Sequence, residues 1–442
     1  MQNSKLEKTA VIGAAGKMGS GISLLLLQAM AMHEAEKNGF SNSKSTLTLI
    51  DVNENGLPAL RKYLRSQMTR YAEKNINTIR KFFSNNNKIV SNEDVIKAFL
   101  EGAFDMIRFD SDLIAARNSK VIFEAMVENI SAKTELFKTL KETRKSDQYY
   151  LTNTSSIPIA LLNSACELNN QIIGFHFYNP PAIQKLVEII FPADTDSELV
   201  TLAHELAKLF RKITVQANDI AGFIGNGYFI REVIYACQQV KLLAIMQSIT
   251  LSQAIYVINS VTQDFLIRPM GIFQLIDYVG VDVCANIAKV MRQYLPDDSL
   301  RDELLDQMVS EGILGGQFAD GSQKNGFFQY ESGEIVGVYS LDKKKYLPIS
   351  EAKDAVNIGI IPEGHVGWKK LLSDQHKGEK LSVYFQNLSR EQSLGAQIAR
   401  NFLDNLTHIA SQLVFSGAAR DKNDVDTVLK NGFYHLYGVQ QK

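Results

Sequence analysis

Short apolar runs recur along the first 190 residues, separated by longer stretches in which apolar and polar positions follow helical spacing. Runs of this length that are rich in Val, Ile, Leu and Phe are typical of buried strands. The expected strands are Thr9–Gly13, Ser45–Ile50, Met106–Asp110, Lys120–Glu124, Tyr149–Thr152, Ile172–Tyr178 and Leu186–Ile190. The expected helices are Ile22–Met32 with an extension toward Lys44, then Asn53–Glu101 and Ser131–Thr143. Such alternation predicts an α/β fold with a doubly wound, mostly parallel sheet.

The second half of the chain has a different pattern, in which long apolar stretches follow helical spacing around the whole circumference. The expected helical stretches are Gly222 to Asp306 and Leu394–Tyr437, and the expected short strands are Glu334–Tyr339 and Tyr346–Ile349. Residues 312–337 are rich in glycine and polar side chains, which is typical of a domain boundary. We therefore expect an α/β domain at 1–220, an all-α domain at 221–332 and a C-terminal extension at 333–442.

Composition narrows the class of protein. The 442 residues are 45% hydrophobic and 21% charged with a formal net charge of −1, so charge offers no basis for binding nucleic acid or an anionic membrane. Cys166, Cys237 and Cys284 lie far apart, which argues against disulfides and against a metal site. The apolar run 22–32 is too short to span a bilayer. Since the N-terminal residues also lack a signal-peptide pattern, we expect a cytoplasmic protein without a metal.

A glycine-rich turn follows the first expected strand and leads directly into the first helix. Its residues are Gly13, Ala14, Ala15, Gly16, Lys17, Met18 and Gly19. Glycine lets the backbone approach a pyrophosphate, and the helix N-terminus offers N–H groups and the positive end of its dipole. Asp51, at the end of the second strand, is positioned to accept hydrogen bonds from the adenosine ribose, which favours NAD over NADP. The pattern therefore predicts a Rossmann-type dinucleotide-binding domain.

Two spacings differ from the usual dinucleotide fingerprint. The glycines follow G-x-x-G-x-x-G instead of G-x-G-x-x-G, so the turn carries one extra residue. Asp51 also lies 38 positions after Gly13 (51 − 13), against roughly 20 in the usual pattern. The structural alternative is a glycine-rich turn that binds no nucleotide.

Polar side chains gather at strand ends between residues 151 and 188. Ser155 follows one expected strand, His176 and Asn179 lie at the end of the next, and Glu188 lies in the strand after that. Open α/β sheets bind ligands at the carboxyl ends of their strands. A histidine beside a carboxylate makes a plausible general base, because the carboxylate fixes the tautomer and favours imidazolium. A single His in an apolar stretch is more often structural, but the clustering favours a catalytic site.

Several of these segments resemble one protein family, the L-3-hydroxyacyl-CoA dehydrogenases. The segments are VIGAAGKMGSGI, EAMVENISAKTELF, LTNTSSIPI, GFHFYNPPAIQKLVE, DIAGFIGN, RPMGIFQLIDYVGVD and QKNGFFQY. They occur in the family's order and approximate spacing and cover residues 5–330. No single motif is decisive, but several in register are specific.

The resemblance implies a role for each matching residue. His176 would remove the proton of the 3-hydroxyl group, Glu188 would pair with it, and Ser155 and Asn226 would bind the substrate oxygen. The positions that match NAD contacts are Gly13, Ala14, Ala15, Gly16, Lys17, Met18, Gly19, Asp51, Glu128, Lys133, Ser155 and Asn179. Lys74, with Gln67 or Ser66, falls where the family contacts the coenzyme A of an acyl-CoA substrate.

The sequence departs from the family pattern at three positions. Gly227 stands where an arginine usually follows the asparagine, Gln184 replaces a methionine, and Lys324 is a displaced substitute for a lysine. Two alternatives stay open. The departures around Gly16 and Gly227 allow a non-catalytic NAD-binding homologue, and a related fold would also suit a different β-hydroxy-acid dehydrogenase. The second usually depends on a helix lysine, so the HFYNP segment speaks against it.

The C-terminal segment VDTVLKNGFYHLYGV loosely resembles AIYVINSVTQDFLIRPMGIFQLIDYVGV, which begins at Ala254. This suggests a diverged second copy of the helical domain, as in long members of the family. The resemblance implies either a homodimer or a monomer in which the second copy replaces the partner. Unrelated amphipathic helices are the alternative.

Overall fold

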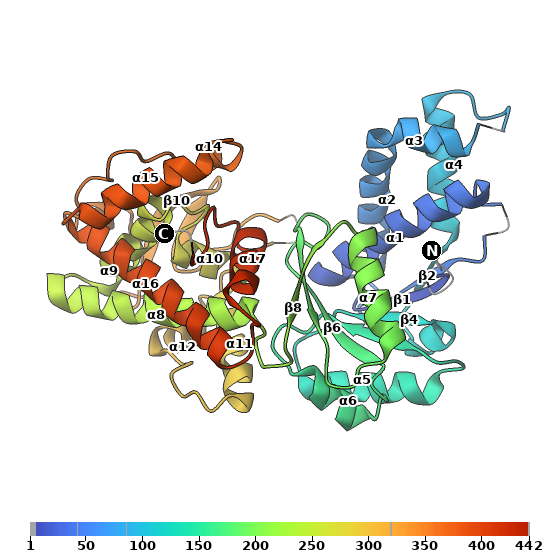
Figure 1. Cartoon of the computed structure of the whole chain (residues 1–442), viewed down its shortest axis with the longest axis horizontal. Helices are drawn as coiled ribbons and strands as arrows, with labels where there is room; N and C mark the ends of the chain where they lie inside the picture. Colours follow the sequence, from blue (N-terminus) through green and yellow to red (C-terminus); the bar gives the residue numbers. More distant parts are fainter. Residues whose placement is uncertain (1–5, 42, 85, 319–320, 441–442) are drawn as a thin grey trace. The chain divides into compact units, whose positions relative to one another are not determined.

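The computed structural model describes residues 6–41, 43–84, 86–318 and 321–440 (Figure 1). The chain divides into two compact units, Met1–Asp219 and Ile220–Lys442. Each unit has an apolar core of its own, and the two are described in turn.

The first unit is built on an eight-stranded sheet in the order β3-β2-β1-β4-β5-β6-β7-β8. The strands are β1 (Lys8–Ile12), β2 (Thr46–Ile50), β3 (Ile107–Asp110), β4 (Val121–Glu124), β5 (Tyr149–Thr152), β6 (Ile172–Phe177), β7 (Leu186–Ile190) and β8 (Ile213–Ala217). All neighbours are parallel except β6 and β7. The strand order reverses between β1 and β4, which is where such sheets bind ligands. The predicted doubly wound, mostly parallel sheet is confirmed.

Helices cover both faces of this sheet (Figure 1). They are α1 (Lys17–Asn38), α2 (Gly56–Lys74), α3 (Ile76–Phe82), α4 (Asn92–Asp105), the 3-10 helix η2 (Leu113–Asn118), α5 (Ile130–Thr143), α6 (Ile159–Cys166) and α7 (Ser197–Leu209). One face packs against α1 and α7, with α2, α3 and α4 extending the same core. The opposite face packs against α5 and α6, for example where Phe137 meets Tyr150 edge to face at 5.5 Å.

Three details of the first unit differ from the expectation. The first helix begins at Lys17, ahead of Ile22, so Lys17, Met18 and Gly19 of the glycine turn lie in its first turn. The single helical stretch 53–101 is three helices, of which α4 begins at a capping box made by Ser91 and Asp94. The strand β8 was not predicted, because it is an edge strand whose Ile213 and Thr214 are exposed and give little apolar signal.

The second unit is mainly helical, as predicted, and also contains a small antiparallel sheet. Its helices are α8 (Gly225–Gln247), α9 (Leu251–Ser260), the π-helix η3 (Val261–Phe265), α10 (Ile272–Val279), α11 (Val281–Tyr294), α12 (Glu303–Ser310), α13 (Ser350–Lys353), α14 (Trp368–Leu372), α15 (Lys377–Arg390), α16 (Leu394–Phe415) and α17 (Lys422–Gly432). Its strands are β9 (Phe328–Glu331), β10 (Glu334–Ser340) and β11 (Lys345–Pro348). The two predicted short strands are confirmed as β10 and β11. Residues on both sides of position 332 share one core.

Two turns of the second unit share one close contact between a glycine and an earlier side chain. A Cβ on Gly271 would lie 2.2 Å from Asn259 Oδ1, and a Cβ on Gly438 would lie 2.1 Å from Asp426 Cγ. Each glycine follows its partner by 12 positions (271 − 259 and 438 − 426). In both turns the partner's Oδ1 accepts a later backbone N–H, at 3.0 Å for Asn259 and 2.7 Å for Asp426. The two segments that resemble each other in sequence thus each pack a glycine against a side chain twelve positions earlier. The amide that this side chain accepts from lies three positions after Gly271 and one position after Gly438.

No single helix in the described ranges is long and apolar enough to cross a membrane. Within these ranges, α8 meets the length and composition of a membrane span only when it is taken together with α9 and η3. The two parts of this pair are bent by 117° at the break between them. The described ranges contain no group of three or more His, Cys, Asp or Glu side chains arranged to hold a metal ion.

Candidate active site at the carboxyl edge of the sheet

The glycine turn begins where β1 ends and is shaped by two close approaches. Gly13 has φ +75°, and a Cβ on it would lie 2.8 Å from the carbonyl oxygen of Ala125. A Cβ on Gly19, in the first turn of α1, would lie 2.0 Å from the carbonyl oxygen of Gly13. Only glycine fits at both positions. The amides of Gly13 and Ala14 donate to Ile50 O at 2.9 and 3.0 Å, which anchors the turn to the end of β2.

The extra residue lengthens this turn without separating its two essential glycines. The amide of Gly16 donates to Gly13 O at 3.1 Å and closes the turn, and Gly16 is then the N-cap of α1. No side chain caps this helix. An uncapped helix N-terminus directly after a strand is suited to bind an anion such as a phosphate.

Asp51 lies beside the glycine turn despite its long separation in sequence. Its Oδ2 accepts from the amide of Ala15 at 2.9 Å, and its Oδ1 accepts from the amide of Asn53 at 2.9 Å. The additional residues between Gly13 and Asp51 are taken up by the length of α1, which has 22 residues, and by the loop after it. Asp51 therefore occupies the place expected of a ribose-binding acid, at the carboxyl end of β2.

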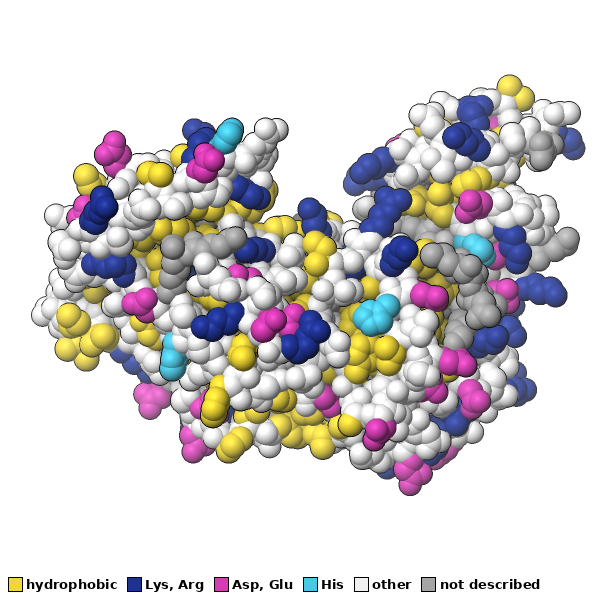
Figure 2. Space-filling view, viewed as in Figure 1, with side chains coloured by type: hydrophobic (Ala, Val, Ile, Leu, Met, Phe, Trp, Pro, Cys, Tyr) yellow, Lys and Arg dark blue, Asp and Glu magenta, His cyan; other side chains and the backbone are white. Residues whose placement is uncertain are grey.

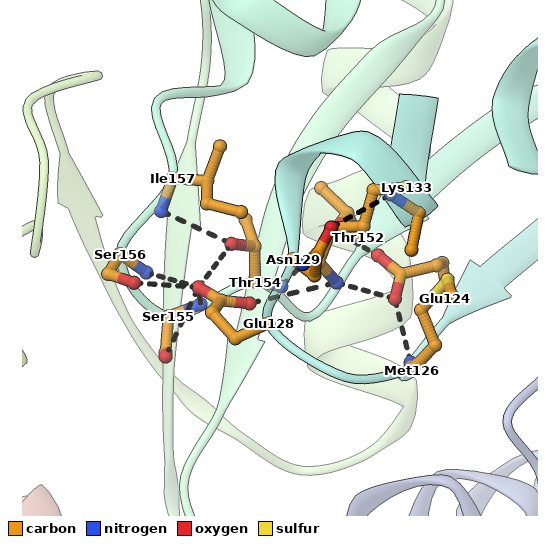
Figure 3. A network of polar contacts seen from close by, with 11 residues as sticks. Glu124, Met126, Glu128, Asn129, Lys133, Thr152, Thr154, Ser155, Ser156 and Ile157 are labelled. Atoms are coloured by element: carbon orange, nitrogen blue, oxygen red, sulfur yellow. Dashed lines mark hydrogen bonds and ion pairs between the residues drawn. The ribbon is translucent and has the colours of Figure 1, made fainter. Parts of the chain in front are cut away.

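Glu128 organises the loop that follows β5 (Figure 3). Its Oε1 accepts from the amides of Ser155 and Ser156 at 2.9 Å each and from the Thr154 hydroxyl at 2.7 Å. The hydroxyls of Ser156 and Ser155 lie 2.8 and 3.4 Å from the same oxygen. Burial raises the pKa of Glu128, but Lys133 and these donors outweigh it, so that the pKa lies below its ordinary value. An ionised Glu128 thus holds Ser155 in place.

A second buried glutamate lies next to this loop and shares the same cation (Figure 3). The ammonium of Lys133 lies 2.6 Å from Glu124 Oε1 and 3.7 Å from Glu128 Oε2. The side chains of Lys133 and Glu124 are 1% and 0% exposed. Glu124 also accepts from the Met126 amide at 2.7 Å and from the Thr152 hydroxyl. Lys133 therefore neutralises two carboxylates, one at the end of β4 and one in the loop that follows it.

His176 and Glu188 form the pair that the sequence predicted. They lie opposite each other in the antiparallel pair β6–β7, with Nδ1 of His176 3.2 Å from Oε1 of Glu188. His176 is 7% exposed and Glu188 is 0% exposed. When the Glu188 carboxylate accepts this bond, Nδ1 carries its hydrogen, and a neutral imidazole then has its lone pair on Nε2. The pair has the composition of a general base with its orienting acid.

The loop between β6 and β7 carries Asn179 and is held by a lysine. Lys212 donates from Nζ to the carbonyl oxygens of Pro181 and Gln184, at 2.6 Å each. Burial lowers the pKa of Lys212 to about 8. Gln184, one of the departures from the family pattern, therefore takes part in this anchor through its backbone.

The remaining predicted residues lie elsewhere. Asn226 is the second residue of α8, in the second unit, and is half-buried. A Cβ on its neighbour Gly227 would lie 2.8 Å from Leu413 Cδ2, so the glycine that replaces an arginine faces α16 closely. Gln67 and Lys74 lie on α2, half-buried and exposed respectively.

Sequence reasoning missed three residues of the site: Glu124, Thr154 and Tyr178. Glu124 and Tyr178 stand at strand ends, the same signal that led to His176, but neither was weighed as a partner. Tyr178 donates to Glu188 Oε1 at 2.6 Å. Which carboxylate each hydroxyl reaches depends on how neighbouring strands are paired, and no local pattern reports that.

The chain is similar to known proteins over most of its length. Residues 8–220 match the family model described as 3-hydroxyacyl-CoA dehydrogenase, NAD binding domain, and residues 222–325 match its C-terminal domain. A probable 3-hydroxybutyryl-CoA dehydrogenase of Bacillus subtilis is 30% identical over 328 residues, which is 73% of this chain and 98% of that protein. A putative fatty acid oxidation complex trifunctional enzyme of Rickettsia prowazekii is 24% identical. The alignment covers 99% of this chain and 53% of that protein.

Solved structures agree in fold. The crystal structure of 3-hydroxybutyryl-CoA dehydrogenase from Escherichia coli matches with a TM-score of 0.63 at 18% identity, over 98% of this chain and 90% of that one. The crystal structure of FadB2 from M. tuberculosis matches with a TM-score of 0.55 at 24% identity, over 74% of this chain and 99% of that one. The first of these likenesses extends through the C-terminal residues.

Proposed function

The chain belongs to the 3-hydroxyacyl-CoA dehydrogenase family, and on this basis we propose that it catalyses the NAD-dependent, reversible oxidation of (S)-3-hydroxyacyl-CoA to 3-oxoacyl-CoA. The observation that carries this proposal is the buried His176–Glu188 pair. It lies in the same unit as a glycine turn and Asp51, so one domain offers both a base and a nucleotide site.

The residues of the first unit fit NAD. The Gly13 turn leaves no room for a side chain, α1 begins without a side-chain cap, and Asp51 stands beside the turn. The turn would hold the pyrophosphate and Asp51 the adenosine ribose, while Glu128, Ser155 and Asn179, in the loops after β4, β5 and β6, would hold the nicotinamide half. When bound, NAD supplies the hydride acceptor.

His176 would act as the general base. Its Nε2 would take the proton of the 3-hydroxyl group, while Nδ1 stays bonded to Glu188. The resulting imidazolium is stabilised by the carboxylate, which has 0% exposure and little competing water. In the reverse direction the same nitrogen would return the proton.

Ser155 and Asn226 would donate hydrogen bonds to the substrate oxygen as its bond to hydrogen is lost. Glu128 accepts from the amide of Ser155, and this bond positions the hydroxyl. Asn226 would contribute its side-chain amide from the start of α8.

The coenzyme A part of the substrate carries several negative charges, and α2 offers basic side chains to meet them. Figure 2 shows Lys and Arg side chains gathered over the helices α2, α3 and α4. Arg61 and Arg65 lie 6.0 and 5.9 Å from the ring centres of Phe109 and Phe104. Lys74, at the end of the helix, and Gln67, about two turns earlier on the same face, are the proposed coenzyme A contacts.

We also propose that the second unit contains two diverged copies of one helical domain. The matching turns at Gly271 and Gly438 support this, as do α8 and α16, which have 23 and 22 residues and pack against each other. On this reading the second copy takes the place of a homodimer partner, and the protein is a monomer. Sedimentation velocity of the full chain would test it, and a stable dimer would contradict it.

The activity is tested by following NADH oxidation with acetoacetyl-CoA. We expect turnover by the wild type and its loss in His176→Asn, with NADH binding retained in a fluorescence titration. His204→Asn is the matched control, because His204 lies on α7 in the same unit and packs against Phe191 at 5.8 Å. NADH binding without turnover at any acyl chain length would instead favour a non-catalytic homologue.

A further inference from the structure

The carboxylate of the His176–Glu188 pair has a second hydrogen-bond donor. Tyr178, one residue beyond the end of β6, donates from Oη to Glu188 Oε1 at 2.6 Å. His176 Nδ1 lies 3.2 Å from the same oxygen. Tyr178 and His176 are two positions apart and so project from the same side of the strand, with ring centres 5.2 Å apart. Two donors therefore converge on one carboxylate oxygen.

Tyr178 stays a donor at every pH at which the enzyme would work. Burial, and then the charge and hydrogen bond of Glu188, raise the pKa of Tyr178 well above its usual range. Its hydroxyl therefore carries its proton while His176 changes charge. The Tyr178 bond is also the shorter of the two bonds to Oε1, as expected for O–H donating to a carboxylate.

We propose that Tyr178 is a positioning residue of the catalytic pair, which orients the Glu188 carboxylate toward His176 and weakens its attraction for the imidazolium. This inference rests on the proposed function of His176 and Glu188. A hydroxyl that donates to a carboxylate disperses part of its negative charge. The carboxylate then stabilises imidazolium less, and His176 gives up its proton more readily near neutral pH.

The charged groups around the pair point to the same arrangement. On β8, the residue paired with Glu188 is the uncharged Val215. Lys212 lies over the ring of Phe177, which alternation along β6 directs to the other face of the sheet from His176. Glu128, in the loop after β4, and Lys133, on α5, are engaged with each other. His176 and Tyr178 are thus the ionisable side chains that β6 places against Glu188.

The test is Tyr178→Phe, which keeps the ring and removes only the hydroxyl. We expect the acid limb of the kcat/KM profile for 3-hydroxyacyl-CoA oxidation to move to higher pH by about half a unit to one unit, because the full charge of Glu188 then acts on His176. We expect kcat near neutral pH to fall about three- to tenfold with KM for the substrate unchanged.

A second measurement does not depend on turnover. NMR of ring-labelled histidine, with the His176 signal assigned by its loss in His176→Asn, should show the midpoint of its titration shifted upward by the same amount in Tyr178→Phe. The matched control is Tyr149→Phe. Tyr149 lies on β5 of the same sheet, and its hydroxyl donates to Glu198 on α7 at 3.1 Å. This substitution should leave both the profile and the His176 titration unchanged.

A fall in kcat with no shift in either measurement would make Tyr178 a packing residue and overturn the inference. A shift of the same size in Tyr149→Phe would overturn it as well. If the wild type shows no turnover, the proposed function fails. The His176 titration then still decides whether Tyr178 weakens the attraction between Glu188 and His176.

Discussion

Lys133→Met is the substitution for which the structure makes the sharpest prediction about stability. The ammonium of Lys133 lies 2.6 Å from Glu124 and 3.7 Å from Glu128, and the side chains are 1%, 0% and 17% exposed. Methionine keeps most of the apolar stem but leaves two carboxylates facing each other without a cation. Removing one partner of a buried ion pair costs about 3–5 kcal/mol. Because Glu128 is partly exposed, we expect a loss near the lower value, about 3 kcal/mol.

Lys141→Met is the matched control, because Lys141 lies on the same helix α5 and also pairs with a glutamate. That pair joins Lys141 to Glu167 at 3.0 Å, but the two side chains are 29% and 83% exposed. Exposed pairs contribute about 0–1 kcal/mol. The double variant Lys133→Met with Glu124→Gln should recover a large part of the loss, since it removes one of the two unpaired charges.

The assay is urea denaturation followed by circular dichroism, combined with hydrogen exchange of peptides covering residues 121–128 and 149–156. The peptides place the loss in the first unit, which matters because two compact units need not unfold in one step. We expect faster exchange at the ends of β4 and β5 in Lys133→Met only. If Lys133→Met costs no more than Lys141→Met, the reasoning about the buried cation is wrong.

Three further predictions concern catalysis, cofactor binding and pH. Glu188→Gln should lower kcat about 10²- to 10⁴-fold while NADH still binds, because His176 loses its charged orienting partner; an unchanged kcat would exclude the pair from catalysis. Asp51→Ala should weaken NADH about tenfold or more in a fluorescence titration, since the acid anchors Ala15 and is the proposed partner of the ribose; equal affinity would place the ribose elsewhere. Burial raises the pKa of Asp277 to about 7. Between about pH 4 and 7 the folded chain therefore keeps a proton on Asp277 that the unfolded chain has lost. The free energy of unfolding then decreases as the pH rises through this range. Asp277→Asn should remove this part of the slope in thermal unfolding, and a slope identical to the wild type would contradict the assignment.

The sequence alone was sufficient wherever the signal is local. A buried strand, a glycine turn and the start of a helix are set by neighbouring residues, so the nucleotide-binding half was predictable from Gly13 and Asp51. The sequence did not show whether Asp51 lies beside a glycine turn that has an extra residue and is 38 positions away. The hydrogen bond from the Ala15 amide to Asp51 at 2.9 Å shows that it does, because α1 absorbs the additional length.

Tertiary structure decided which polar groups meet. The sequence placed His176 and Glu188 on adjacent strands, but only the antiparallel register of β6 and β7 sets them opposite each other and brings Tyr178 to the same oxygen. Glu128 and Lys133 were recognised only through a resemblance, and their buried contacts depend on the parallel pairing of β4 with β5. Helix and strand periodicity is a property of short segments, whereas strand register and buried charge pairing arise when distant segments share one core. For that reason the sequence predicted His176 and Glu188 but not Tyr178, and the tertiary structure determined which of these groups meet.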